Sequence, residues 1–156
     1  MPPTLIFDLS PYDLDRVLYD REGIRQINPH RFEFEMLDVV VHCDSKRMIG
    51  FKDVRNDEFW VRGHIPGRPL MPGVFMIEAA AQAASIYAQT QLKWPGFIGF
   101  GGVDKFKFRQ AVVRGQRLLI ILEPRWDRHR RVCCATQGLV QGNLVFEGEI
   151  IGTQMG

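Results

Sequence analysis

The sequence predicts an α+β protein in which an antiparallel sheet of about six strands wraps around one long central helix. The helix is expected over residues 74–91, which contain no proline or glycine and six alanines. Its first half is apolar on every side, so we expect the helix to be buried. Six further segments have the composition of strands and are separated by turn residues. They cover residues 33–44, 47–55, 97–109, 116–126, 131–141 and 144–154.

Length and composition indicate one domain spanning residues 1–156, because 156 residues with 46% hydrophobic side chains can bury a substantial core. Residues 1–27 are interpreted as an N-terminal arm followed by a short helix. Ser10 has the character of a helix N-cap and is followed by proline, and Gly23 is expected to end this helix.

Turn residues separate several of the strands. Asp44 and Ser45 predict a turn between the first two strands, and Gly142 and Asn143 predict a tight hairpin between the last two. In residues 105–109, phenylalanines alternate with Lys and Arg, which predicts one apolar and one basic face.

Charge and cysteine usage argue against several classes of protein. A net charge of +2 is too small to indicate nucleic-acid binding, and the three cysteines form neither a disulfide framework nor a metal-ligand spacing. The N-terminus has no signal-peptide pattern, and the long helix is too polar at its end for a membrane span. We therefore expect a cytoplasmic protein without a metal or other cofactor.

Four polar residues interrupt the apolar helix, and they are Glu78, Gln82, Ser85 and Gln89. Spacings of four, three and four residues place them on one stripe of the helix. A carboxylate in such apolar surroundings loses hydration, which favours the protonated form of Glu78, and Gln82 can fix its rotamer by a hydrogen bond. The alternative is a buried Glu that pairs with an Arg or Lys elsewhere in the chain.

The loop before the helix carries a second candidate residue, His64. An imidazole titrates near neutral pH and suits a general base, although a structural, hydrogen-bonding histidine is an equal alternative. Free backbone N–H groups near Gly73 and Val74 could hold a carbonyl oxygen at the start of the helix. The other histidines considered, His30 and His42, are interpreted as structural or solvated.

Residues 63–82 read GHIPGRPLMPGVFMIEAAAQ. They resemble the signature of the 3-hydroxyacyl-[acyl-carrier-protein] dehydratases (Z type) of type II fatty acid synthesis, and only Ile65 departs from the usual phenylalanine. Residues 28–32, NPHRF, and residues 102–109, GVDKFKFR, resemble two further segments of that family. The resemblance extends from about residue 27 to the end of the chain.

This resemblance implies the hot-dog fold and a reaction. The reaction is loss of water from a (3R)-3-hydroxyacyl thioester on the carrier protein to give the trans-2-enoyl thioester. His64 would be the base at C2 and Glu78 the acid that protonates the leaving hydroxyl. The Gly73 amide would hold the thioester carbonyl, and the substrate would also meet Ile65, Val74 and Gln82.

The resemblance also implies partners. The substrate arrives on acyl carrier protein, for which two basic patches are candidate docking sites: the face of residues 105–109, and the arginines at positions 125, 128, 130 and 131. The family forms homodimers, commonly as a trimer of dimers, in which each site takes its His from one subunit and its acid from the other. The nine-residue step from His64 to Gly73 could stretch about 30 Å, so the sequence alone allows either arrangement.

Two other functions remain as alternatives. A hot-dog acyl thioesterase also uses a carboxylate on the helix, but the His64 motif argues against it. A non-catalytic acyl-thioester-binding protein would not need both His64 and Glu78. Acyl chain length and the choice between primary fatty acid synthesis and another lipid pathway stay open.

Overall fold

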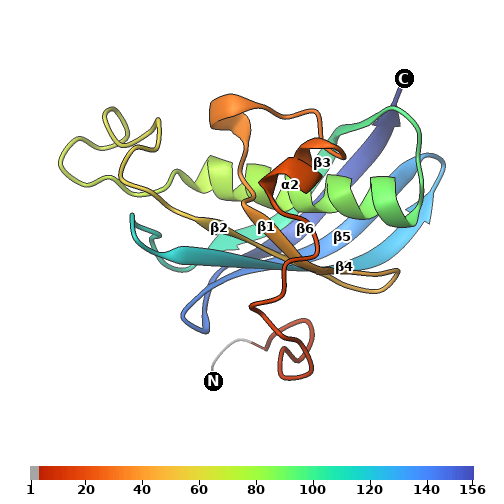
Figure 1. The fold of residues 1–156 in the computed structure, drawn as a ribbon, viewed down its shortest axis with the longest axis horizontal. Helices are drawn as coiled ribbons and strands as arrows, with labels where there is room; N and C mark the ends of the chain where they lie inside the picture. Colours follow the sequence, from red (N-terminus) through yellow and green to blue (C-terminus); the bar gives the residue numbers. More distant parts are fainter. Residues whose placement is uncertain (1–3) are drawn as a thin grey trace.

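A computed structural model of the chain describes residues 4–156. It contains one six-stranded antiparallel sheet in the order β1-β2-β4-β5-β6-β3, with a long helix, α2, lying across one face (Figure 1). The strands are β1 Val39–Cys43, β2 Met48–Asp53, β3 Phe97–Phe108, β4 Arg117–Arg128, β5 Arg131–Val140 and β6 Asn143–Met155. The helical elements are α1 Arg21–Arg25, the 3-10 helix η1 Phe32–Phe34 and α2 Gly73–Gln91. The predicted α+β class and the sheet around a central helix are confirmed.

Helix α2 fills the concave side of the sheet. Its small residues Ala79, Ala80, Ala83 and Ala84 are at most 1% exposed, so the backbone of α2 can lie close to the strands. Aliphatic side chains of β4 and β5 complete this core from below. Residues 75–91 are buried or partly buried, as the composition predicted, whereas Val74 in the first turn is exposed.

The N-terminal residues cover the opposite face of the sheet, below the strands in Figure 1. Phe7 packs there against Ile49 and Phe51 of β2 and makes a second, smaller core. The predicted helix from Ser10 to Gly23 is wrong, because the Ser10 hydroxyl donates to Asp8 instead of capping a helix. The short helix is α1, which begins after Asp20; the Asp20 side chain accepts from the Gly23 amide within it.

The first predicted strand, residues 33–44, is too long. Only Val39–Cys43 form β1, and η1 occupies Phe32–Phe34. The side chain of Gln82 takes the backbone groups that a longer strand would use, since it donates to the Phe34 carbonyl and accepts from the Met36 amide. A side chain from α2 thus replaces a strand neighbour along this segment.

The turn between β5 and β6 lies one residue earlier than predicted. Gln141 and Gly142 occupy it, both with positive φ, and Asn143 already belongs to β6. Two successive residues with positive φ are typical of the type I′ hairpin turn. The turn at Asp44 is confirmed, and its carboxylate accepts from the amides of Lys46 and Arg47.

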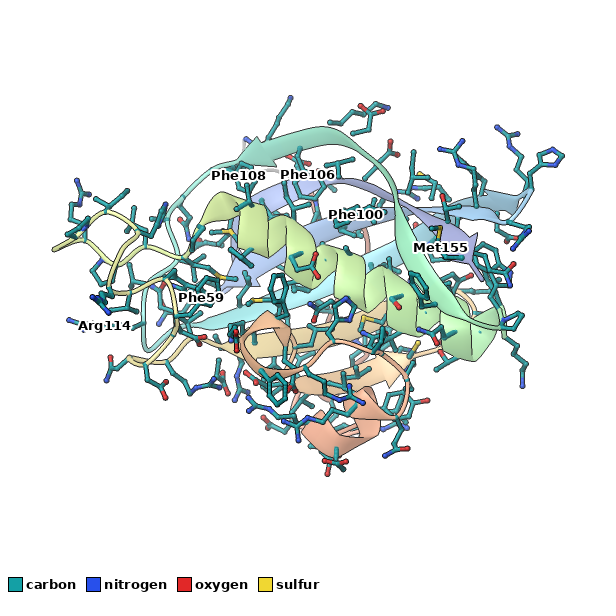
Figure 2. The ribbon with its side chains drawn as sticks, turned by 90° about the horizontal axis from the view of Figure 1, so that it is seen from above. Phe59, Phe100, Phe106, Phe108, Arg114 and Met155 are labelled. Carbon is teal, nitrogen blue, oxygen red and sulfur yellow. The ribbon has the colours of Figure 1, made fainter. Side chains whose placement is uncertain are left out.

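Among residues 4–156, strand β3 is an edge of the sheet and pairs only with β6. The alternation in residues 105–109 is confirmed in part: Phe106 stacks on Phe146, while Phe108 lies over the start of α2 (Figure 2). The basic face is offset by acids of β6, because Arg109 pairs with Glu147 and Lys105 lies 3.8 Å from Glu149. No helix within residues 4–156 is both long and apolar enough to cross a membrane.

Candidate active site

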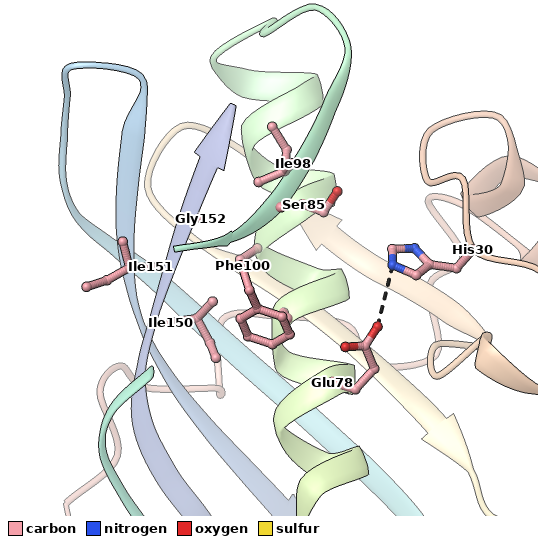
Figure 3. A pocket seen from close by; sticks show the side chains of 11 residues that line it. His30, Glu78, Ser85, Ile98, Phe100, Ile150, Ile151 and Gly152 are labelled. Atoms are coloured by element: carbon pink, nitrogen blue, oxygen red, sulfur yellow. Dashed lines mark ion pairs between the residues drawn. The ribbon is translucent and has the colours of Figure 1, made fainter. Parts of the chain in front are cut away.

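Glu78 projects from α2 into a small cavity of about 50 Å³ between the helix and strands β3 and β6. The side chain of Glu78 is 19% exposed. Figure 3 shows apolar side chains, among them Phe100 and Ile150, on one side of the carboxylate and His30 on the other. A carboxyl group there can exchange a proton with a bound molecule while apolar side chains shield it from much of the solvent.

The polar stripe of α2 forms a continuous hydrogen-bond network. Gln82 is 2% exposed, and its amide donates to Glu78 Oε1 over 2.9 Å while both its polar atoms also bind the backbone of residues 34–36. One and two turns later, Ser85 and Gln89 reach the side chain of Asn28. The network fixes the rotamer of Gln82 and, through it, the direction of the Glu78 carboxyl group. The predicted stripe and the predicted contact between Gln82 and Glu78 are confirmed.

His30 is the second ionisable group beside Glu78. Its Nε2 lies 3.4 Å from Glu78 Oε1, and both side chains line the same cavity (Figure 3). Burial lowers the pKa of His30; the nearby Glu78 charge opposes this shift and Arg31 adds to it. Sequence reasoning assigned no role to His30, which is separated from Glu78 by 48 residues.

His64 lies in the loop between β2 and α2, which extends beyond the first turn of α2 in Figure 1. Its Nδ1 is 2.8 Å from the Leu70 carbonyl oxygen. A carbonyl only accepts, so Nδ1 carries the hydrogen, and in a neutral imidazole Nε2 then keeps its lone pair. This tautomer can take a proton through Nε2.

A buried ion pair anchors the His64 loop to the sheet. Lys52 of β2 lies 3.0 Å from Glu58, and the two residues are 1% and 8% exposed. The Glu58 carbonyl accepts from Val61, and the Trp60 carbonyl accepts from the amide of His64 over 2.8 Å. The position of the His64 backbone therefore depends on this pair and on Trp60.

The start of α2 offers unpaired backbone donors. Within residues 4–156, the amides of Gly73 and Val74 have no hydrogen-bond acceptor, and the preceding Pro72 provides no side-chain cap. A Cβ at Gly73 would lie 3.1 Å from the ring of Phe108, so glycine fits closely beneath that ring (Figure 2). These amides could hold a partial negative charge at the helix N-terminus.

Ile65 follows His64 and has a φ of 53°, which is unusual for a β-branched residue. Its side chain is 48% exposed, and that of Val74 is 68% exposed. Both side chains therefore leave apolar surface open beside the His64 loop and the start of α2.

The structure brings some of the predicted site residues together and leaves others apart. Glu78 and Gln82 are in contact, whereas His64 does not line the cavity of Glu78 and contacts Leu70 instead. Sequence reasoning missed His30 and the Lys52–Glu58 pair. The NPHRF segment was a signal for His30, but nothing in the sequence connects positions 52 and 58 to the loop. In residues 4–156, no three His, Cys, Asp or Glu side chains cluster as metal ligands would.

Comparisons with known proteins identify the family of the chain. The FabA-like domain family matches residues 28–150. The 3-hydroxyacyl-[acyl-carrier-protein] dehydratase FabZ of Desulfotalea psychrophila is 32% identical over 152 residues, which is 93% of this chain and 96% of that protein.

Solved structures share the fold at low sequence identity. The dehydratase heterocomplex ApeI:P from Xenorhabdus doucetiae superposes with a TM-score of 0.74 at 16% identity, over 85% of this chain and 91% of that one. Cj0977, a sigma28-regulated virulence protein from Campylobacter jejuni, superposes with a TM-score of 0.65 at 17% identity, over 90% and 93%. The fold is thus the hot-dog fold, and the chain belongs to the FabA-like family.

Proposed function

We propose that this chain is a 3-hydroxyacyl-[acyl-carrier-protein] dehydratase of fatty acid biosynthesis. The observation that carries the proposal is a carboxyl group, Glu78, held by Gln82 in a largely apolar cavity of a FabA-like fold. The relative of 32% identity bears the name of this activity, and the similarity covers nearly the whole of both chains.

The reaction needs a base, an acid and a group that stabilises the enolate. His64 takes the proton from C2 through its free Nε2, and the electrons of that C–H bond form the C2–C3 double bond. Glu78 gives its proton to the C3 hydroxyl as the C–O bond breaks, and water leaves. The amides of Gly73 and Val74 bind the thioester oxygen, on which negative charge builds, and Ile65 and Gln82 border the bound substrate.

His64 and Glu78 of one site come from two subunits of a homodimer in this proposal. Within one chain, His64 contacts Leu70 and is absent from the cavity of Glu78. Edge strand β3 supports pairing of two copies, because it is twelve residues long and carries Phe97, Phe100 and Val103 with about half of each side chain exposed. Joining two β3 edges would continue the sheet, and three such dimers would give the hexamer that the family resemblance implies.

Carrier docking is better supported beside the His64 loop than at the patches predicted from sequence. Arg125 pairs with Glu123, and Arg109 pairs with Glu147, so part of the positive charge of both patches is neutralised. Arg68 and Arg114 are exposed and line one depression with Leu70, whose carbonyl binds His64; Figure 2 labels Arg114 near that loop. We propose that these two arginines receive the acidic carrier.

Charge reversal tests this docking site. Arg68→Glu with Arg114→Glu should raise the KM for carrier-linked substrate and change the KM for the same acyl group on coenzyme A much less. Arg125→Glu with Arg128→Glu is the matched variant at the patch predicted from sequence. Equal losses on both substrates would reject carrier recognition by Arg68 and Arg114.

A thioester assay tests the proposed function against the two alternatives. We expect hydration of a short trans-2-enoyl thioester, measured as loss of enoyl absorbance without release of free thiol. Thiol release would indicate a thioesterase, and binding without turnover would indicate a non-catalytic acyl-thioester-binding protein. Repeating the assay with longer chains gives the chain-length preference.

The cellular location proposed for this enzyme is the cytoplasm. Cys43, Cys133 and Cys134 are all unpaired, which fits a reducing compartment.

A further inference from the structure

His30 touches the described site but has no part in the proposed reaction so far. It lies in the segment between α1 and η1, and its Nε2 faces Glu78 Oε1 at 3.4 Å. Its other ring nitrogen, Nδ1, is buried and has no hydrogen-bond partner within residues 4–156. This unequal environment of the two nitrogens determines which one carries the hydrogen.

A buried N–H without an acceptor is rarer and costlier than a buried lone pair without a donor. Nδ1 therefore carries no hydrogen, and His30 is the neutral tautomer with its hydrogen on Nε2, the nitrogen that lies 3.4 Å from Glu78 Oε1. Burial lowers the pKa of His30 and keeps the ring neutral near pH 7. The charged groups that face His30 are Glu78 on α2 and Arg31 in its own segment.

Two nitrogens then lie near one oxygen of the Glu78 carboxyl group, and one of them already donates a hydrogen bond to it. Gln82 Nε2 donates to Oε1 over 2.9 Å, and His30 Nε2 approaches the same atom. A separation of 3.4 Å exceeds the usual hydrogen-bond length, but catalytic contacts of this kind often shorten when substrate binds. Because Oε1 faces two donors, it is an unfavourable position for a proton.

We propose that His30 is a positioning residue that, with Gln82, keeps the acidic proton of Glu78 on Oε2 and stabilises the carboxylate left after proton transfer. This inference rests on the proposed function. The proton moves from Oε2 to the C3 hydroxyl oxygen, the C–O bond breaks and water departs. The negative charge left on Glu78 is then shared between Oε2 and Oε1, and the N–H groups of Gln82 and His30 stabilise it at Oε1.

Variants at His30 test the proposal through the split between kcat and KM. His30→Ala should lower kcat by about tenfold to a hundredfold, the effect expected for losing a hydrogen bond to a charged group, with KM nearly unchanged. His30→Gln should recover part of kcat, because its amide can also donate to Oε1. The matched control is His42→Ala, which removes a histidine that pairs with Asp44 away from the site and should leave kcat unchanged.

A double variant separates positioning from general structural damage. If His30 acts through Glu78, then His30→Ala should cause no further loss in a Glu78→Gln background. A full, additive loss in that background would overturn the proposal, as would wild-type kcat in folded His30→Ala.

Nitrogen NMR of the wild-type protein gives a test that needs no variant to fold. Near pH 7, we expect a protonated Nε2 and a bare Nδ1 for His30. The opposite tautomer or an imidazolium would overturn the proposal. Failure of this inference is distinct from failure of the proposed function: wild-type activity in Glu78→Ala rejects Glu78 as the acid, whereas loss in Glu78→Ala with wild-type activity in His30→Ala rejects only the role of His30.

Discussion

The two halves of the proposed site are built in opposite ways. Glu78 lies on a long buried helix, and its direction is fixed by a hydrogen bond from Gln82, whose side chain is itself held by two hydrogen bonds to backbone groups. His64 lies in a loop that extends past the helix, and its ring has one hydrogen bond, to Leu70. The next residue, Ile65, is about half exposed and has positive φ.

This difference indicates which half of the proposed site a single chain supplies in full. The acid side has a cavity, a positioning network and an apolar wall, all from one chain. The base side has a defined tautomer and an anchored backbone, but within residues 4–156 His64 does not line the cavity of Glu78. The His64 loop is thus held in place but lacks an acid, as expected if His64 contributes to the site of a neighbouring subunit.

Loss of either reacting group should give the largest effect. His64→Ala and Glu78→Ala should each lower turnover by about two to four orders of magnitude, the usual range for a general acid or base. The double variant should lose far less than the product of the two effects, because both groups act in one step. Glu78→Gln should fold normally and keep only the low residual turnover of Glu78→Ala, and near wild-type turnover in either alanine variant would end the assignment.

The second largest effect is expected from breaking the Lys52–Glu58 ion pair that anchors the His64 loop. Glu58→Gln leaves Lys52 buried without a counter-charge, so we expect a loss of about 3–5 kcal/mol in the free energy of unfolding, measured in urea. Glu123→Gln removes a partner of the more exposed Arg125 and should cost at most about 1 kcal/mol. Similar losses for the two variants would mean that the Lys52–Glu58 pair does not anchor the loop.

A substitution at Gly73, which fits closely against Phe108, should have a smaller effect on stability. In Gly73→Ala, the new methyl group meets the ring of Phe108 at about 3.1 Å, so the ring or the helix must shift. Overpacking of this kind costs about 1–3 kcal/mol, and we expect kcat to fall because the carbonyl-binding amides move. Adding Phe108→Ala should restore part of kcat; no improvement would place the damage elsewhere.

The smallest expected effect is the contribution of His30, beside Glu78, to the pH dependence of stability. Burial lowers the pKa of His30 below its unfolded value of about 6.5, so below that pH the unfolded chain binds more protons at this residue than the folded chain does. Stability should therefore fall as pH drops from about 7 to 5. In His30→Gln this contribution is absent, and its Tm should fall less over the same range. Parallel Tm curves would show that His30 is not the group responsible.

The sequence predicted those parts of the fold that depend on local pattern. The helix predicted over residues 74–91 is confirmed as α2 and begins one residue earlier, at Gly73. The contact between Glu78 and Gln82 follows from a spacing of four residues on one helix. The strand predicted over residues 33–44 is wrong at residues 33–38, because the side chain of Gln82 from α2 binds the backbone groups of Phe34 and Met36, and no local pattern reports such a long-range contact.

The other features of the fold and of the site depend on tertiary contacts, which the spacing of residues along the sequence does not predict. His30 meets Glu78 only because the segment after α1 runs along α2, held there by the bond from Asn28 to the Gln82 carbonyl. The N-terminal residues have a helix-start pattern at Ser10, yet burial of Phe7 and its neighbours on the sheet outweighed that weak local preference. The proposed cooperation of His64 with Glu78 of a second chain depends on contacts between subunits, which residue spacing within one sequence does not report.

Mixing two inactive subunits tests most directly whether His64 and Glu78 of one site come from different chains. His64→Ala and Glu78→Ala subunits would be unfolded together, refolded, and the mixed dimers counted by mass. Each mixed dimer would hold one site with both wild-type residues and one with neither, so random pairing should restore about a quarter of wild-type activity. No recovery, with mixed dimers present at the expected half of the total, would contradict the account and place each site within a single chain.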